Sequence, residues 1–187
     1  MSDTTTLKWQ DLLRLWPAML AMVVVIVASN WLVQFPINDW LTYGAFTYPV
    51  AFLVSGLTNR RAGPQAARQV AWLGFAVAVC LSAWLAPVRI AAASGIAFLF
   101  SQLLDISVFH RLRRQSWWRA PLIASALASI LDTAIFFSCA FAGTEMPWLT
   151  LAIGDLGVKL AMAVFLLVPF RLLLPVILGT RTSGPTR

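Results

Sequence analysis

The chain has 187 residues, of which 60% are hydrophobic and only 11% are charged, and its mean hydropathy is +0.80. A soluble globular domain has roughly 45–50% apolar and about 25% charged residues, so this composition indicates an integral membrane protein. At about 20 residues for each membrane-spanning helix, the length allows six or seven spans and leaves no room for a soluble catalytic domain.

Six stretches of the sequence are long and apolar enough to cross a bilayer core of about 30 Å as helices. The connections between these stretches are short. We therefore predict an all-α integral membrane protein with a single domain of six transmembrane helices, followed by a cytoplasmic tail at 180–187. The predicted spans are residues 13–34, 42–59, 69–88, 90–109, 120–142 and 147–170.

The basic residues are distributed unevenly between the two sides of the predicted bundle. They gather before the first span, in the connections at 59–68 and 110–119, and in the tail, whereas the opposite connections hold only Arg89 as a basic residue. Cytoplasmic connections of membrane proteins are enriched in Lys and Arg. The sequence thus predicts that both termini are cytoplasmic. Membrane topology also explains the net charge of +7, so we expect no nucleic acid as a direct partner.

Four ionisable residues fall inside the predicted spans, where a charge costs roughly 2.5–3.5 kcal/mol at the helix centre and usually marks a functional site. Asp132 lies near the middle of its span without an evident partner nearby in sequence. Asp155 and Lys159 share a helical face and can pair, either to neutralise each other or to serve function. Asp105 lies nearer the cytoplasmic end, where the alternative is an ion pair with a neighbouring arginine.

Amide side chains add donors and acceptors to this predicted interior. Asn30 and Gln34 are one helical turn apart in the first span, and Gln102 precedes Asp105 by three residues in the fourth. An amide presents a donor and an acceptor side by side. Such groups suit the edge of a nucleobase or of another planar amide.

The second predicted span holds two aromatic residues that can stack on a planar ligand, Phe46 and Tyr48, although packing against lipid or the protein core is the alternative. Pro49 weakens the backbone hydrogen bonding of the same span and predicts a bend that lines a cavity. The sequence has no phosphate-binding GxxxxGK[ST] motif, no HExxH motif and no cysteine cluster. We therefore expect no enzymatic activity, no metal and no cofactor.

Several polar strings resemble the queuosine precursor transporter family, also called the YhhQ or vitamin-uptake-like family. The likeness covers nearly the whole chain. It is carried by SNWLVQFP at Ser29–Pro36, GAFTYPVAFLVSGLTNR at Gly44–Arg60, SQLLDISVFHRLR at Ser101–Arg113, DTAIFF at Asp132–Phe137 and DLGVK at Asp155–Lys159.

The resemblance implies an importer of 7-deazaguanine precursors, preQ0 (7-cyano-7-deazaguanine) and preQ1, in the bacterial inner membrane. It also implies a fold similar to the substrate-binding subunits of energy-coupling-factor transporters. The alternative function is such a subunit in an ATP-driven vitamin or nucleobase uptake complex. The alternatives for a protein partner are a second copy of the chain, which would form a homodimer, and a separate energising module. The chain departs from the family at Gly56, where an acidic residue is usual.

A deazaguanine offers N–H donors along one edge and a carbonyl oxygen, so the resemblance assigns complementary roles to the polar residues. A carboxylate, Asp132 or Asp105, accepts the N–H groups, and an amide donates to the carbonyl. An aromatic ring covers the base, while Lys159 neutralises Asp155 or holds a gating helix. The predicted substrate-binding residues are Asn30, Gln34, Phe46, Tyr48, Gln102, Asp105, Asp132, Asp155 and Lys159.

Overall fold

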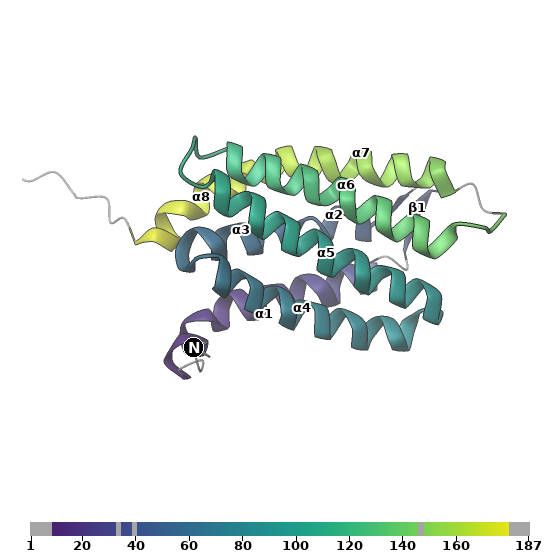
Figure 1. Ribbon diagram of the computed structural model, residues 1–187, viewed down its shortest axis with the longest axis horizontal. Helices are drawn as coiled ribbons and strands as arrows, with labels where there is room; N and C mark the ends of the chain where they lie inside the picture. The colour runs from purple at the N-terminus through teal and green to yellow at the C-terminus, as the bar shows by residue number, and fades with distance from the viewer. Residues whose placement is uncertain (1–8, 33–34, 39–40, 146–147, 180–187) are drawn as a thin grey trace, which may run out of the picture.

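The computed structural model describes residues 9–32, 35–38, 41–145 and 148–179. This part of the chain is helical apart from one antiparallel pair of very short strands, and its long helices run side by side (Figure 1). The elements are α1 (Trp9–Leu32), β1 (Pro36–Asn38), β2 (Leu41–Thr42), α2 (Gly44–Thr47), α3 (Val50–Ala62), α4 (Pro64–Leu85), α5 (Val88–Leu112), α6 (Arg119–Phe141), α7 (Trp148–Phe165) and α8 (Leu167–Leu178).

Five helices in the described residues are each long and apolar enough to cross a membrane, namely α1, α4, α5, α6 and α7. Their ends follow local chemistry. Gly63 adopts a φ of 88°, which is strained for residues with a side chain, and it lets the chain reverse between α3 and α4. Pro64 then occupies the start of α4, where its missing N–H is not needed.

The second predicted span, 42–59, is not one continuous helix. Its first residues belong to β2 and the four-residue α2, and α3 begins only at Val50. Pro49 lies at the break because it has no N–H to donate to the preceding turn. The chain is therefore interrupted at this proline, and Tyr48 lies at the junction of α2 and α3.

The last predicted span, 147–170, is also interrupted. α7 ends at Phe165 and α8 begins at Leu167. A proline ring clashes with the carbonyl four residues earlier in a helix. Pro169 stands four residues after Phe165 and accounts for the end of α7 at that point.

The helix α1 shows how apolar residues divide between the core and the surroundings. Met22 and Ile26 are fully buried, whereas Leu20, Val24 and Val27 on the remaining surface of the helix are exposed. A broad exposed apolar face is unfavourable in water but matches the hydrocarbon of a bilayer. The exposed face of α1 thus has the composition of a lipid-facing surface.

Small residues allow the central helices to approach closely. Packing of this kind is typical of membrane bundles, where close backbone contact replaces the hydrophobic effect as the source of association. The buried alanines of α4, α5 and α6 are Ala66, Ala67, Ala71, Ala78, Ala93, Ala97, Ala120, Ala124, Ala128 and Ala140.

The two basic connections lie at one end of the bundle, together with the start of α1 and the end of α8 (Figure 1). There the guanidinium of Arg60 donates a hydrogen bond to the carbonyl of Arg113 and joins the two connections. At the opposite end, Arg89 donates to the carbonyls of Cys139 and Ala142 at 2.9 and 2.6 Å. The segregation of basic connections expected from the sequence is present in the fold.

Gly56 is buried in α3 against two aromatic rings. A Cβ atom at this position would lie 3.1 Å from Cε2 of Phe109 and 3.6 Å from Cε2 of Phe170. The two rings contact each other with centroids 5.9 Å apart. A side chain at this position would therefore require the ring of Phe109 to shift.

Candidate functional site

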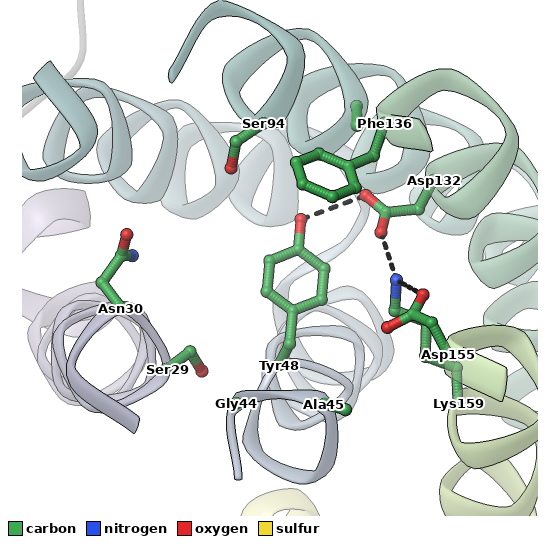
Figure 2. Close-up of a pocket in the computed structure, with 11 residues that line it drawn as sticks. Ser29, Asn30, Gly44, Ala45, Tyr48, Ser94, Asp132, Phe136, Asp155 and Lys159 are labelled. Carbon is green, nitrogen blue, oxygen red and sulfur yellow. Dashed lines mark hydrogen bonds and ion pairs between the residues drawn. The ribbon is translucent and has the colours of Figure 1, made fainter. Parts of the chain in front are cut away.

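A cavity of about 150 Å³ lies between α1, α2, α5, α6 and α7 (Figure 2). A cavity of this size can hold a small ring compound. Polar side chains line two sides of it, from α1 and from the facing helices α6 and α7. The lining residues are Ser29, Asn30, Gly44, Ala45, Tyr48, Ser94, Ala97, Asp132, Phe136, Asp155 and Lys159.

A buried charge cluster forms one wall of the cavity. Nζ of Lys159 lies 2.8 Å from Oδ2 of Asp132 and 2.5 Å from Oδ2 of Asp155. The exposed fractions of the Lys159 and Asp132 side chains are only 6% and 5%, while Asp155 retains 19%. Thr133 completes the cluster, because its hydroxyl donates to Asp155 at 2.9 Å and accepts from Lys159 at 3.3 Å.

The predicted pair of Asp155 and Lys159 is confirmed, and Asp132, which has no evident partner nearby in sequence, finds one in Lys159, 27 residues along the chain. Asp132 is on α6 and Lys159 on α7, and the packing of these two helices brings their side chains together. One ammonium therefore neutralises two carboxylates. If all three groups are ionised, the cluster carries a net charge of −1.

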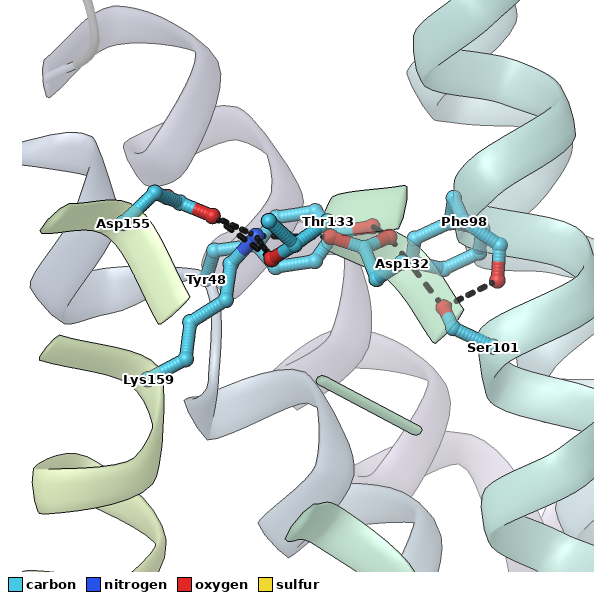
Figure 3. A network of polar contacts seen from close by, with 7 residues as sticks. All are labelled: Tyr48, Phe98, Ser101, Asp132, Thr133, Asp155 and Lys159. Carbon is cyan, nitrogen blue, oxygen red and sulfur yellow. Dashed lines mark hydrogen bonds and ion pairs between the residues drawn. The ribbon is translucent and has the colours of Figure 1, made fainter. Parts of the chain in front are cut away.

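Two hydroxyl groups contact Oδ1 of Asp132, the carboxylate oxygen that Lys159 does not contact (Figure 3). The hydroxyl of Tyr48 donates to Oδ1 of Asp132 at 3.2 Å, and the single proton of the Ser101 hydroxyl is shared between Oδ1 of Asp132 at 3.3 Å and the carbonyl of Phe98 at 3.0 Å. The Lys159 ammonium also lies 5.5 Å from the centroid of the Tyr48 ring, a favourable cation–π position. Asp132 thus has hydrogen-bond partners on both oxygens and a fixed orientation.

Two polar atoms on the cavity wall have no hydrogen-bond partner among the described residues. Oδ2 of Asp155 accepts from Thr133 and Lys159, which leaves Oδ1 open. On the α1 side, the hydroxyl of Ser29 is buried and unpaired. Because unpaired polar groups are unfavourable inside a membrane, these two atoms are the first candidates to contact a ligand.

Five of the predicted site residues line the cavity: Asn30, Tyr48, Asp132, Asp155 and Lys159. Asn30 is anchored by donating to the carbonyl of Ile26 at 2.9 Å.

Three further predicted site residues, Phe46, Gln102 and Asp105, do not line this cavity. Phe46 is exposed on α2. Gln102 is fully buried and accepts from Ser55 at 2.5 Å. Asp105 is buried further along α5, and Gln34 falls outside the described residues.

Sequence reasoning did not assign site roles to Ser29, Thr133 and Phe136. Phe136 follows Asp132 by four residues on α6, so helical spacing places its ring on the same face. Ser29 immediately precedes Asn30 at the end of α1. Thr133 could not be recognised from spacing, because its role depends on the contact between α6 and α7.

The arrangement suits recognition of a small planar molecule with several N–H groups. The carboxylates accept hydrogen bonds, Lys159 and the hydroxyls donate, and the aromatic rings of Tyr48 and Phe136 can cover a ring face. No group of three or more potential metal ligands of the His, Cys, Asp and Glu types occurs within the described residues.

Comparisons with known proteins identify the family of the chain. Residues 83–174 match the family model described as "Putative vitamin uptake transporter". The queuosine precursor transporter of Escherichia coli (strain K12) is 31% identical over 79% of this chain and 80% of its own length. The "Probable queuosine precursor transporter" of Haemophilus influenzae is 32% identical over the same shares.

A third relative, the "Probable queuosine precursor transporter" of Bacillus subtilis (strain 168), is 28% identical over 65% of this chain and 66% of its own length. No solved structure matches the chain. The identities and the extent of the matches show that the chain belongs to the queuosine precursor transporter family of membrane proteins.

Proposed function

We propose that the protein imports the 7-deazaguanine precursors of queuosine, preQ0 and preQ1, across the bacterial inner membrane for salvage into tRNA. The observation that carries this proposal is the charged cavity around Asp132, Asp155 and Lys159 inside a bundle of apolar helices. Ionisable side chains inside membrane bundles usually line a substrate or ion pathway. The names of the relatives supply the class of cargo.

The bundle crosses the membrane six times in this proposal. Five crossings are the long helices, and α2 with α3 forms another, since together they return the chain from the end of α1 to the start of α4 (Figure 1). A broken helix is tolerated in a membrane where the interrupted backbone lines a cavity. A six-helix bundle with an internal site is the architecture expected of a protein similar to energy-coupling-factor substrate-binding subunits.

The basic end of the bundle faces the cytoplasm in this proposal. In a background with Cys80 and Cys139 replaced by serine, Arg113→Cys should react with a membrane-impermeant thiol reagent only after cells are permeabilised. Glu145→Cys, in the connection at the opposite end, should react in intact cells and serves as the control. Labelling of Arg113→Cys in intact cells would show that this end faces outward and would contradict the proposed orientation.

The open oxygen of Asp155 is the proposed acceptor for the N–H edge of the deazaguanine. Oδ1 of Asp132 is already occupied by Tyr48 and Ser101, so Asp132 positions Lys159 and Tyr48 rather than taking the first hydrogen bond of the substrate. The hydroxyl of Ser29 on the opposite wall is available to a second polar group of the base. Tyr48 and Phe136 supply aromatic faces.

The charge of the cluster favours the cationic precursor. Asp132 and Asp155 bring two negative charges and Lys159 one positive charge, so a bound cation would neutralise the site. An uncompensated charge is costly in a membrane interior. The primary amine of preQ1 supplies this cation, whereas the nitrile of preQ0 is neutral.

Calorimetric titration of the purified protein tests this proposal directly. The parent should bind both precursors, and Asp155→Asn should weaken preQ1 binding by about tenfold, equivalent to ~1.4 kcal/mol. The affinity for preQ0 should fall less, because only hydrogen bonding and not charge attraction is lost. Glu145→Gln removes an exposed carboxylate away from the cavity and should bind as the parent does. A folded parent that binds neither precursor would overturn the proposed function.

A further inference from the structure

Asp105 is a buried carboxyl group that the substrate cavity does not use. It lies on α5 with 1% of its surface exposed, and neither carboxylate oxygen has a hydrogen bond of normal geometry. The hydroxyl of Ser125 on α6 is the group near enough to interact with it. The ion pair with a neighbouring arginine, which the sequence left as an alternative, is not formed among the described residues.

The elements packed against this part of α5 present neutral groups. From α3, Asn59 donates to the carbonyl of Ile106 at 2.8 Å, and from α4, Ala67 and Ala71 pack on Ile106. From α6, Ser129 is buried with its hydroxyl unpaired. The charged side chains that these three helices carry make no ion pair with Asp105 in the described part of the chain; they are Arg60, Arg61, Arg68, Arg119 and Asp132.

A carboxylate in these surroundings would have no counter-ion, no exposure to solvent and only the nearby hydroxyl of Ser125 as a donor. Burial of such a charge is strongly unfavourable. The neutral acid is different, since its single O–H can donate to a hydroxyl or a backbone carbonyl. The closed bundle therefore accommodates Asp105 with a proton bound, and loss of that proton requires water or a rearrangement of α5 against α6.

Asp105 is connected to the substrate cavity along one face of α5. Ser101 precedes Asp105 by four residues, one helical turn, and its hydroxyl donates to Asp132 at 3.3 Å. A movement of α5 that hydrates Asp105 would therefore also disturb a hydrogen bond of the charge cluster. This contact gives a physical route by which the protonation of Asp105 and the state of the cavity can depend on each other.

We propose that Asp105 is the binding site of a coupling proton, so that import of the precursor is driven by the proton gradient. The inference rests on the proposed transport function. The step is a proton transfer alone: the carboxylate takes H⁺ from water admitted on the outer side and returns it to water on the cytoplasmic side. The substrate forms no bond with Asp105.

Reconstitution of the purified protein in liposomes tests this inference. An imposed pH gradient, acidic outside, should drive accumulation of preQ1 by the parent, and a protonophore should abolish it. Asp105→Asn mimics the neutral acid and cannot release a proton. It should bind preQ1 as the parent does but only equilibrate it, losing accumulation completely. Glu145→Gln, an exposed carboxylate, is the matched control and should accumulate preQ1 normally.

A second measurement does not depend on the folding of the variant. With a pH-sensitive dye inside liposomes containing the parent, addition of preQ1 outside should acidify the lumen. Absence of this acidification during uptake would overturn the inference, as would accumulation by Asp105→Asn equal to that of the parent. Binding of preQ1 without proton-driven accumulation contradicts this inference alone, whereas absence of binding contradicts the proposed function as well.

Discussion

Replacement of Lys159 by methionine should produce the largest loss of stability of any single change in the charge cluster. Lys159 is the cation for two buried carboxylates, at 2.8 Å from Asp132 and 2.5 Å from Asp155. Its removal leaves two like charges together, and breaking a single buried pair already costs about 3–5 kcal/mol. Folded yield and thermal stability in detergent should therefore fall sharply, whereas Arg61→Met, an exposed cation, should change neither.

Combined substitutions test whether the cluster has three charged members rather than two. Asp155→Asn with Lys159→Met should recover stability only in part, because Asp132 is still buried without a cation. Addition of Asp132→Asn removes the last charge and should restore stability close to that of the parent. Full recovery of stability in the double variant would show that the buried Asp132 carboxylate does not need Lys159 as its counter-ion.

The sequence was sufficient to predict the long helices and one of the two ion pairs. Apolar stretches specify membrane-spanning helices by length and composition, and the four-residue spacing of Asp155 and Lys159 places both on one face. The pair between Lys159 and Asp132 could not be predicted in this way. It depends on how α6 and α7 are rotated about their axes when they pack, and local periodicity does not determine that rotation.

Prolines in the sequence mark two interruptions of the helices. Pro49 predicts a bend in its span, and the chain is interrupted there between α2 and α3. Pro169 carried the same information for the end of α7 at Phe165, but hydropathy alone extended the predicted span across it. Gln102 was assigned to the site from residue type, yet its side chain faces Ser55 on α3. Residue type identifies a candidate, and packing decides which cavity it reaches.

Asp132→Asn should abolish uptake while leaving most of the protein folded. The variant keeps the close pair of Lys159 with Asp155, so the cluster becomes neutral and no charge is left alone. The asparagine can direct its carbonyl oxygen to Lys159 and its amide N–H₂ to the hydroxyls of Tyr48 and Ser101, which also accept hydrogen bonds. Its stability should therefore exceed that of the Lys159→Met variant.

Transport by Asp132→Asn is expected to fail because the cavity loses the negative charge that attracts a cationic precursor and the counter-ion that orients Lys159. Uptake of labelled preQ1 by cells, divided by the amount of folded protein, measures this effect. Ser101→Ala is the matched control, since it removes one hydrogen bond to the same carboxylate but no charge, and it should retain most of the uptake. If Asp132→Asn takes up preQ1 at the parental rate, Asp132 only supports the packing of α6 and α7. If Asp132→Asn and Ser101→Ala lose uptake equally, transport requires the hydrogen bonding of Asp132 and not its charge.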